Sequence, residues 1–164
     1  MARKNNRMKT EYHRGLGFDP RKYISAPVQR TGYILPDRTP QRGDIWFANL
    51  GTHSNSSVQS GTRPVVIISN DIGNCHADTV NVIPMTRHLK KPELPCHTQL
   101  DPFSVSGGSQ LLAPSMVLAE QLTTISKNAL RTFAGHISDD EAMNRIETAV
   151  LSQFALERSV SECL

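Results

Sequence analysis

Two polar residues stand at the ends of apolar segments and have side chains suited to a phosphate group. Arg63 separates the polar stretch QSGT from the apolar run PVVII, and Thr86 closes the segment TVNVIPMT. A guanidinium is a permanent cation whose forked N–H groups match phosphate oxygens, and a hydroxyl both donates and accepts hydrogen bonds. Taken singly, an arginine at a strand edge is more often a surface ion-pair partner, and a threonine in a strand is usually a β-former. The pair gains meaning only if the fold brings the two residues together.

The elements that must position them are short strands. Segments rich in Val, Ile, Thr and aromatic residues alternate with Gly, Pro, Asn, Asp and Ser clusters, which is the pattern of strands joined by turns. We predict strands at residues 44–50, 63–69, 79–85, 96–100, 115–125 and 131–137. If the second and third strands are antiparallel neighbours, the start of one lies beside the end of the other. Arg63 would then lie near Thr86.

A helix is predicted after the last strand. Ser138 and Glu141 have the spacing of a capping box, and Asp139 and Asp140 favour the positive end of a helix dipole. One apolar stripe follows, formed by Ala142, Ile146, Ala149, Val150 and Phe154. The pattern predicts a mainly β (α+β) protein: a small, curled, mostly antiparallel sheet or barrel closed by a C-terminal amphipathic helix.

Two long connections interrupt this compact pattern. Residues 51–62, GTHSNSSVQSGT, are polar and glycine-rich, and residues 87–95 carry Arg87, His88, Lys90 and Lys91. Loops of this length in a compact domain are usually either disordered or functional lids and binding loops. Both would lie at the end of the sheet that carries Arg63.

Charge divides the chain into an arm and a body. Residues 1–42 contain ten Lys or Arg against three acids, whereas the remainder contains eight against twelve. With four prolines and no apolar period, residues 1–40 are predicted to form an extended or disordered basic arm, and residues 41–164 the folded domain. The arm has the charge to contact nucleic-acid phosphates. A solubilising tail and an over-long translated start are the alternatives, and together they are slightly favoured.

Membrane insertion, disulfides and metal sites are not expected. The apolar run Val65–Ile68 is far too short to span a bilayer, no leader precedes it, and a bacterial cytoplasmic protein is the default. Cys75, Cys96 and Cys163 are odd in number and widely spaced. Two belong to Cys-His dipeptides, but neighbouring residues on a strand point to opposite faces, so Cys96 and His97 are not expected to share a metal ion. No cofactor is predicted.

Several of these segments together resemble the MazF/PemK family of toxin endoribonucleases. The resemblance is carried, in order over residues 41–156, by RGDIWFANL, SSVQSGTRPVVIISNDIGN, TVNVIPMT, KKPELPCHTQL, LAEQLTTISKNAL and GHISDDEAM. It implies an SH3-like barrel of the CcdB/MazF type, a homodimer, and sequence-selective cleavage of single-stranded RNA without a metal ion. It also implies inhibition by a small acidic antitoxin. Arg63 and Thr86 match the family's catalytic arginine and threonine.

The implied chemistry needs no protein nucleophile. The RNA 2'-hydroxyl attacks the adjacent phosphorus, which leaves a 2',3'-cyclic phosphate and a 5'-hydroxyl, while Arg63 stabilises the added charge and Thr86 hydrogen-bonds the same phosphate. One of Trp46 and Phe47 is expected in the core and the other on a base. His97 is either a proton carrier or, as is commoner for a histidine in a sheet, a hydrogen-bonded strand residue. Glu120 and Gln121 either line the groove or, as we favour, support the dimer. The candidate RNA contacts are Trp46, Ser57, Gln59, Ser60, Gly61, Thr62, Arg87, Lys90, His97 and Glu120.

Departures from the family pattern leave alternatives open. Val58 stands where many relatives have glutamate, Ser60 stands where they have glycine, and the basic arm has no usual counterpart. A catalytically weak module that binds RNA, DNA or a partner on the same barrel is one alternative. A CcdB-like toxin that attacks gyrase is another, but Arg63 and Thr86 argue against both.

Overall fold

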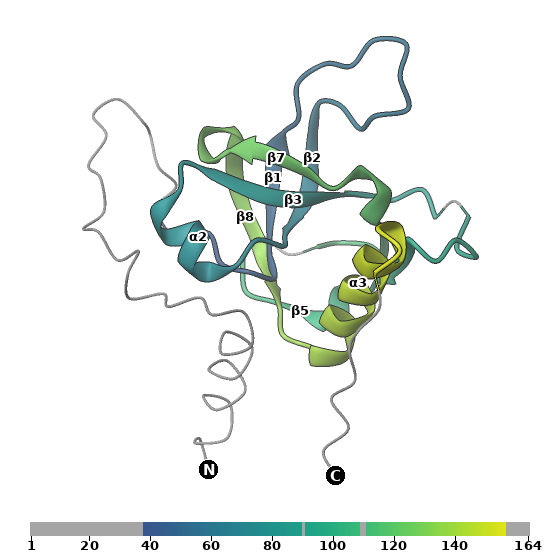
Figure 1. The fold of residues 1–164 in the computed structure, drawn as a ribbon. Helices are drawn as coiled ribbons and strands as arrows, with labels where there is room; N and C mark the ends of the chain where they lie inside the picture. The colour runs from purple at the N-terminus through teal and green to yellow at the C-terminus, as the bar shows by residue number, and fades with distance from the viewer. Residues whose placement is uncertain (1–37, 90, 109–110, 157–164) are drawn as a thin grey trace, which may run out of the picture. The chain divides into compact units, whose positions relative to one another are not determined.

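Three neighbouring antiparallel strands form the centre of the sheet in the computed structural model, which describes residues 38–89, 91–108 and 111–156. β1 (Asp44–Asn49) pairs with β2 (Thr62–Ile67), and β2 pairs with β3 (Thr79–Thr86). Figure 1 shows the long connection between β1 and β2 extending away from the ends of these strands. The predicted antiparallel pairing of the second and third strands is confirmed.

Five shorter or outer strands complete the described sheet. They are β4 (His97–Leu100), β5 (Val105–Ser106), β6 (Ser115–Leu118), β7 (Thr123–Ser126) and β8 (Leu130–Ile137). The strand order is β4-β6-β3-β2-β1-β8-β5, with β7 pairing to β3 beside β6. All pairings are antiparallel, and the sheet curls into a half-barrel. This confirms the predicted fold class, although β5 was not predicted.

The single strand predicted at 115–125 is wrong. A 3-10 turn, η4 (Ala119–Gln121), separates β6 from β7. On β3, residues up to Val82 pair with β7, whereas residues from Met85 onward pair with β6. Pro84 lies in the gap between the two pairings and has no N–H to donate, so a continuous ladder along this edge of β3 was not available.

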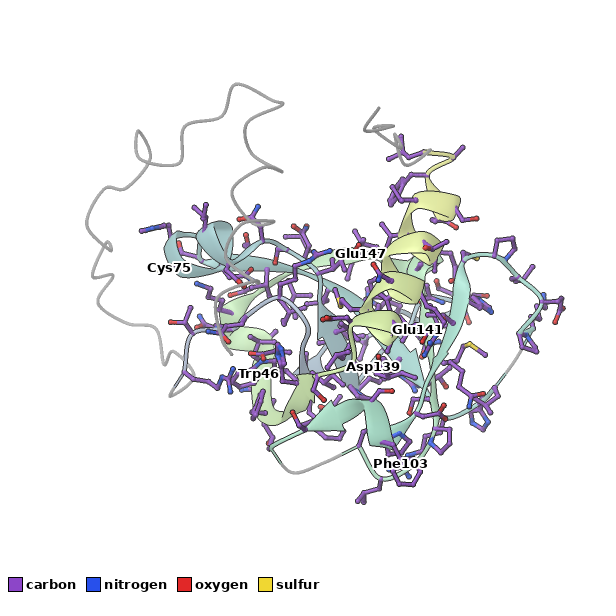
Figure 2. The ribbon with its side chains drawn as sticks, turned by 90° about the horizontal axis from the view of Figure 1, so that it is seen from below. Trp46, Cys75, Phe103, Asp139, Glu141 and Glu147 are labelled. Atoms are coloured by element: carbon purple, nitrogen blue, oxygen red, sulfur yellow. The ribbon has the colours of Figure 1, made fainter. Side chains whose placement is uncertain are left out.

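The C-terminal helix differs from the prediction at its N-terminal cap. α3 (Asp140–Gln153) is capped by Asp139, whose carboxylate accepts from the Glu141 amide, while the predicted cap Ser138 instead donates to the Ser104 carbonyl. Figure 2 shows Asp139 at the beginning of α3. A short helix, α2 (Asp71–His76), was not predicted, because six residues are too few to show a helical period. Two further 3-10 turns are η3 (Pro102–Ser104) and η5 (Lys127–Ala129).

Two apolar clusters lie on opposite faces of the central strands. The first joins the sheet to α3 and contains Ile45, Val66, Ile83, Met85, Leu100, Leu111, Val117, Ala134, Ile137, Ala142 and Ile146. The second contains Trp46, Ala48, Val65, Ile67, Val80, Val82 and Leu130. Of the predicted helix stripe, Ala142, Ile146 and Ala149 are buried, whereas Phe154 is 53% exposed just beyond the helix end.

A buried carboxylate fixes the beginning of β1. The Asp44 side chain has no exposed area and accepts from the Arg38 guanidinium at 3.0 and 3.1 Å and from the Gln41 amide at 2.9 Å. It also lies 2.9 Å from the His136 Nδ1 on β8. Arg38 in turn lies over the Phe133 ring. Apart from residues 38–40, the predicted arm lies outside the described residues, so the division at residue 41 stays a prediction.

The described helices include no candidate membrane span. The longest helix in the described ranges, α3, is only 14 residues long and carries several charged side chains.

Candidate functional site

Arg63 on β2 and Thr86 on β3 stand two residues beyond the last pair of the β2–β3 ladder, Val65 with Pro84. Val65 pairs with Pro84 and Val66 with Ile83, so the same register continued by two residues sets Arg63 opposite Thr86. Alternation along each strand places both on the face of the second cluster, since Val65 lies two residues from Arg63, and Val82 lies four from Thr86. The strand register agrees with the predicted juxtaposition, while the shared role of Arg63 and Thr86 at a phosphate stays a prediction.

The guanidinium of Arg63 is oriented by its own loop. Its Nε donates to the Ser60 carbonyl at 2.9 Å, and the residue is half-buried. Its two terminal nitrogens have no hydrogen-bond partner among the residues that the structure describes. Because Nε is already engaged, the forked end of the side chain is held in place while its outer N–H groups stay available for an anion.

Thr86 presents a hydroxyl at the end of β3. Its Oγ1 accepts from the His88 amide at 3.2 Å, which fixes the oxygen against the start of the next loop. A hydroxyl that accepts one such bond retains its own proton for donation. Thr86 can thus donate to an oxygen of the same phosphate that Arg63 binds.

The β1–β2 loop is fastened at its base and on one side. Leu50 and Gly61 continue the hairpin, with the Leu50 amide donating to the Gly61 carbonyl at 2.9 Å and the Gly61 amide to the Gly51 carbonyl at 2.7 Å. From η4, the Gln121 side chain accepts from the Gln59 amide at 2.7 Å and donates to the Ser57 carbonyl at 3.3 Å. We call these two bonds the Gln121 clamp. Gln121 therefore contacts this loop directly, a role that the sequence did not predict.

Gln59, whose main-chain amide belongs to the clamp, has a buried side-chain oxygen. Its side-chain Oε1 is buried and has no hydrogen-bond partner within the described ranges. A buried acceptor without a donor is costly, by about 1–3 kcal/mol. The predicted base contact from Gln59 therefore requires its amide side chain to turn outward from this arrangement.

The side chains of His97 and Glu120 contact each other near the same face. Leu100, at the far end of β4, packs in the first cluster, so alternation puts His97 on the opposite face, with Arg63 and Thr86. The His97 Nε2 lies 3.2 Å from a Glu120 carboxylate oxygen, and its Nδ1 lies 3.0 Å from the Lys91 carbonyl. The His97 side chain is only 7% exposed, while that of Glu120 is 31% exposed.

The structure corrects one predicted contact and leaves others in reach of solvent. Trp46 is 3% exposed and packs edge-on against Phe133 in the second cluster, so it is not available to stack on a base. Figure 2 labels its position in the body of the protein. Solvent reaches the predicted contacts Ser57, Ser60, Gly61, Thr62 and Arg87, and Lys90 lies outside the described residues.

Val58, the departure from the family pattern, lies on the open side of the loop. Its side chain is 51% exposed, and the Val58 amide donates to the Ser56 hydroxyl at 3.0 Å. The β1–β2 loop therefore adopts this conformation without a carboxylate at position 58.

Comparison with known proteins places this arrangement in a family. Residues 41–154 match the family model described as PemK-like, MazF-like toxin of type II toxin-antitoxin system. Endoribonuclease EndoA of Bacillus subtilis strain 168 is 36% identical over 116 residues, which are 71% of this chain and 95% of that protein.

Two solved structures agree with the fold. A MazF from Deinococcus radiodurans superposes with a TM-score of 0.60 at 17% identity, covering 73% of this chain and all of that one. A mycobacterial endoribonuclease in complex with its cognate antitoxin gives a TM-score of 0.56 at 25% identity, covering 72% of this chain and 97% of that one. The sequence match over most of the domain and the shared fold lead to one conclusion: the chain belongs to the PemK-like, MazF-like family of type II toxin-antitoxin toxins.

Proposed function

We propose that this protein is a toxin endoribonuclease that cuts single-stranded RNA at selected sequences without a metal ion. The observation that carries the proposal is the antiparallel register of β2 and β3, which, continued by two residues, brings Arg63 opposite Thr86 on one face. The long loop that ends at Arg63 borders the same place. Membership of a family that contains a protein named as an endoribonuclease supports the same activity.

The reaction uses the substrate's own nucleophile. The ribose 2'-hydroxyl gives its proton to water and bonds to the adjacent phosphorus. The bond from phosphorus to the 5'-oxygen breaks, and that oxygen takes a proton from solvent in return, so the step consumes no net proton. The products are a 2',3'-cyclic phosphate and a 5'-hydroxyl. The outer N–H groups of Arg63 stabilise the added negative charge on the phosphorane oxygens, and the Thr86 hydroxyl donates to one of them.

Substrate selection follows from the same geometry. DNA lacks the 2'-hydroxyl and is not cut. We assign backbone contacts to the exposed part of the loop and to Arg87 and Lys90, because cations and main-chain N–H groups hold phosphates without reading bases. His97 and Glu120 are assigned to the base-reading side of the groove. Val58 alters the loop surface and therefore the recognised sequence.

We also propose two protein partners. A second copy of the chain forms a homodimer, and a small acidic antitoxin covers the RNA site. The unpaired end of Arg63 supports the antitoxin assignment, since a carboxylate binds a guanidinium as a phosphate does. A related endoribonuclease has been solved with its cognate antitoxin. Acting on mRNA, the free toxin works in the bacterial cytoplasm and stops growth.

The proposal is tested on the purified full-length chain with a long defined RNA in EDTA. We expect cuts at one short sequence, ends that carry a 2',3'-cyclic phosphate, and no cutting where a single 2'-deoxynucleotide replaces the ribose 5' to the scissile bond. Cutting of the 2'-deoxy linkage, or cutting only after a divalent ion is added, would contradict the mechanism. RNA binding without any cutting would instead favour the catalytically weak module.

A further inference from the structure

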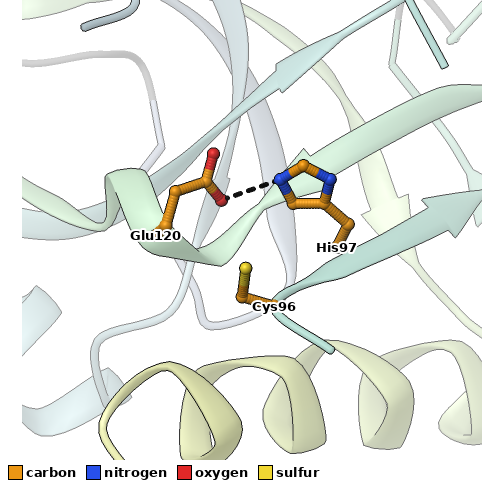
Figure 3. A group of neighbouring side chains, drawn as sticks. All are labelled: Cys96, His97 and Glu120. Carbon is orange, nitrogen blue, oxygen red and sulfur yellow. Dashed lines mark ion pairs between the residues drawn. The ribbon is translucent and has the colours of Figure 1, made fainter. Parts of the chain in front are cut away.

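Three side chains able to bind a metal meet beside η4. Ligand atoms of Cys96, His97 and Glu120 all lie within 4.8 Å of one another, and no other such group of three occurs in the described parts of the chain. Figure 3 shows the Glu120 carboxylate directed at the His97 ring, with the Cys96 sulfur close to both. The expectation that Cys96 and His97 diverge was wrong because Cys96 belongs to the turn before β4, where strand alternation does not apply.

Main-chain hydrogen bonds hold the segments that carry these three residues next to each other. The Ala119 amide donates to the Cys96 carbonyl at 3.0 Å, which ties the turn before β4 to the 3-10 turn that carries Glu120. His97 also pairs with Leu118 in the β4–β6 ladder. The ligands therefore come from two segments that are already joined by main-chain hydrogen bonds.

The imidazole of His97 is oriented for metal binding. A carbonyl can only accept, so the contact with the Lys91 carbonyl at 3.0 Å places a proton on Nδ1. In the neutral ring, Nε2 then presents its lone pair to the Glu120 oxygen 3.2 Å away. Two acceptors face each other, and they require a shared proton or a cation between them. A backbone carbonyl on the far nitrogen is also the usual way in which proteins orient a metal-binding histidine.

The combination of sulfur, nitrogen and oxygen selects the kind of metal. Mg²⁺ and Ca²⁺ prefer oxygen ligands alone, whereas zinc binds thiolate, imidazole and carboxylate together. Zinc–ligand distances near 2.1 Å put a nitrogen and an oxygen about 3.4 Å apart in a tetrahedral site, close to the present 3.2 Å. A zinc–sulfur distance near 2.3 Å puts the sulfur about 3.5 Å from the nitrogen, which falls inside the 4.8 Å limit that the three ligand atoms satisfy.

We propose that Cys96, His97 and Glu120 form a zinc site, with the fourth position open to water. Zinc binds cysteine as the thiolate, so the Cys96 sulfur is the anionic ligand of this site. Glu120 is partly exposed and gives the ion access from solvent. The ligands do not include Arg63 or Thr86, so the metal takes no part in the cleavage step, although His97 and Glu120 also lie on the side of the groove assigned to base reading.

The test is a titration of the metal-free, reduced full-length chain with Co²⁺, followed by displacement with Zn²⁺. We expect one equivalent of Co²⁺ to give thiolate charge-transfer absorption and the d–d bands of a tetrahedral ion. Cys96→Ser should abolish the charge-transfer band, and Glu120→Gln should weaken binding at least tenfold. Cys75→Ser is the matched control, because Cys75 is an exposed free cysteine in α2, and should leave the spectrum unchanged, as should Cys163→Ser.

Two outcomes would overturn the proposal. One is the absence of a tetrahedral cobalt spectrum in the wild type. The other is a spectrum that persists in Cys96→Ser or disappears in Cys75→Ser, which would place the metal elsewhere. Far-ultraviolet circular dichroism of each metal-free variant checks that it is folded, and Glu120→Gln removes a partly exposed carboxylate should Cys96→Ser fail to fold. None of these readouts uses RNA, so they stand apart from the test of cleavage.

Discussion

Removing the Gln121 clamp should loosen the β1–β2 loop without unfolding the protein. In Gln121→Ala, the loop loses the 2.7 Å bond from the Gln59 amide and the 3.3 Å bond to the Ser57 carbonyl. The first is short and partly buried and is worth about 1 kcal/mol, and the second is long and exposed and is worth about 0.5 kcal/mol. The sum of about 1.5 kcal/mol corresponds to a roughly tenfold larger population of the open loop.

Hydrogen exchange measures this population directly. The Gln59 amide should exchange roughly tenfold faster in Gln121→Ala, while amides in the central strands keep their protection, because opening is confined to the loop. Gln121→Glu keeps an acceptor for the Gln59 amide but loses the donor to Ser57, and it should show a smaller effect. Gln99→Ala changes an exposed glutamine on β4 and serves as the matched control.

The reasoning is refuted if Gln59 exchanges at the wild-type rate in Gln121→Ala, since the clamp would then contribute nothing to loop order. Faster exchange throughout the sheet would be equally contrary, because it would show that Gln121 supports the whole fold. RNA cleavage by the same variant should fall together with loop protection, since the loop carries the carbonyl that orients Arg63.

Three further predictions concern stability. Asp44→Ala should lower the free energy of unfolding by about 2–3 kcal/mol in urea titrations, because a fully buried carboxylate and its hydrogen bonds are lost. Glu93→Ala changes an exposed residue and should have almost no effect. The hydrogen bond from Ser104 holds the pKa of Asp139 below its ordinary value of 3.8. The ionised carboxylate therefore stabilises the folded protein above pH 3.8, and this contribution is lost as pH falls through the folded pKa. Acid unfolding should accordingly be less steep in Asp139→Asn. Zinc at a hundred times its dissociation constant should stabilise the wild type by about 2.7 kcal/mol and raise its Tm by roughly 10 °C, but should leave Cys96→Ser unchanged in differential scanning fluorimetry.

The sequence was most informative where local pattern and pairing agree. Arg63 and Thr86 could be placed together because two apolar segments with clear limits had to pair as antiparallel neighbours. The apolar stripe of α3 likewise predicted its buried face at Ala142, Ile146 and Ala149. In each case, a period of two or 3.6 residues reports directly on which side chains are buried.

The sequence was least informative where a side chain hydrogen-bonds to a backbone group far away in the chain. Nothing in the spacing of Gln121 indicates a partner 62 residues away in the β1–β2 loop. The division of 115–125 depends on Pro84 in another strand, and the position of Cys96 depends on a turn whose conformation the residues do not specify. Trp46 was ambiguous because either of two adjacent aromatic residues can face a core when a sheet has apolar clusters on both faces.

The most direct test of the central claim is the cleavage rate of Arg63→Ala on an RNA with one mapped site, measured in EDTA under single-turnover conditions. Arg131→Ala is the matched control, because Arg131 is exposed on β8. Removing a positioned donor to a transition-state oxyanion typically costs about 10²–10³ in rate, so Arg63→Ala should be slower by that factor while Arg131→Ala cuts normally. A folded Arg63→Ala protein that cuts the same site at the wild-type rate would show that the catalytic centre lies elsewhere.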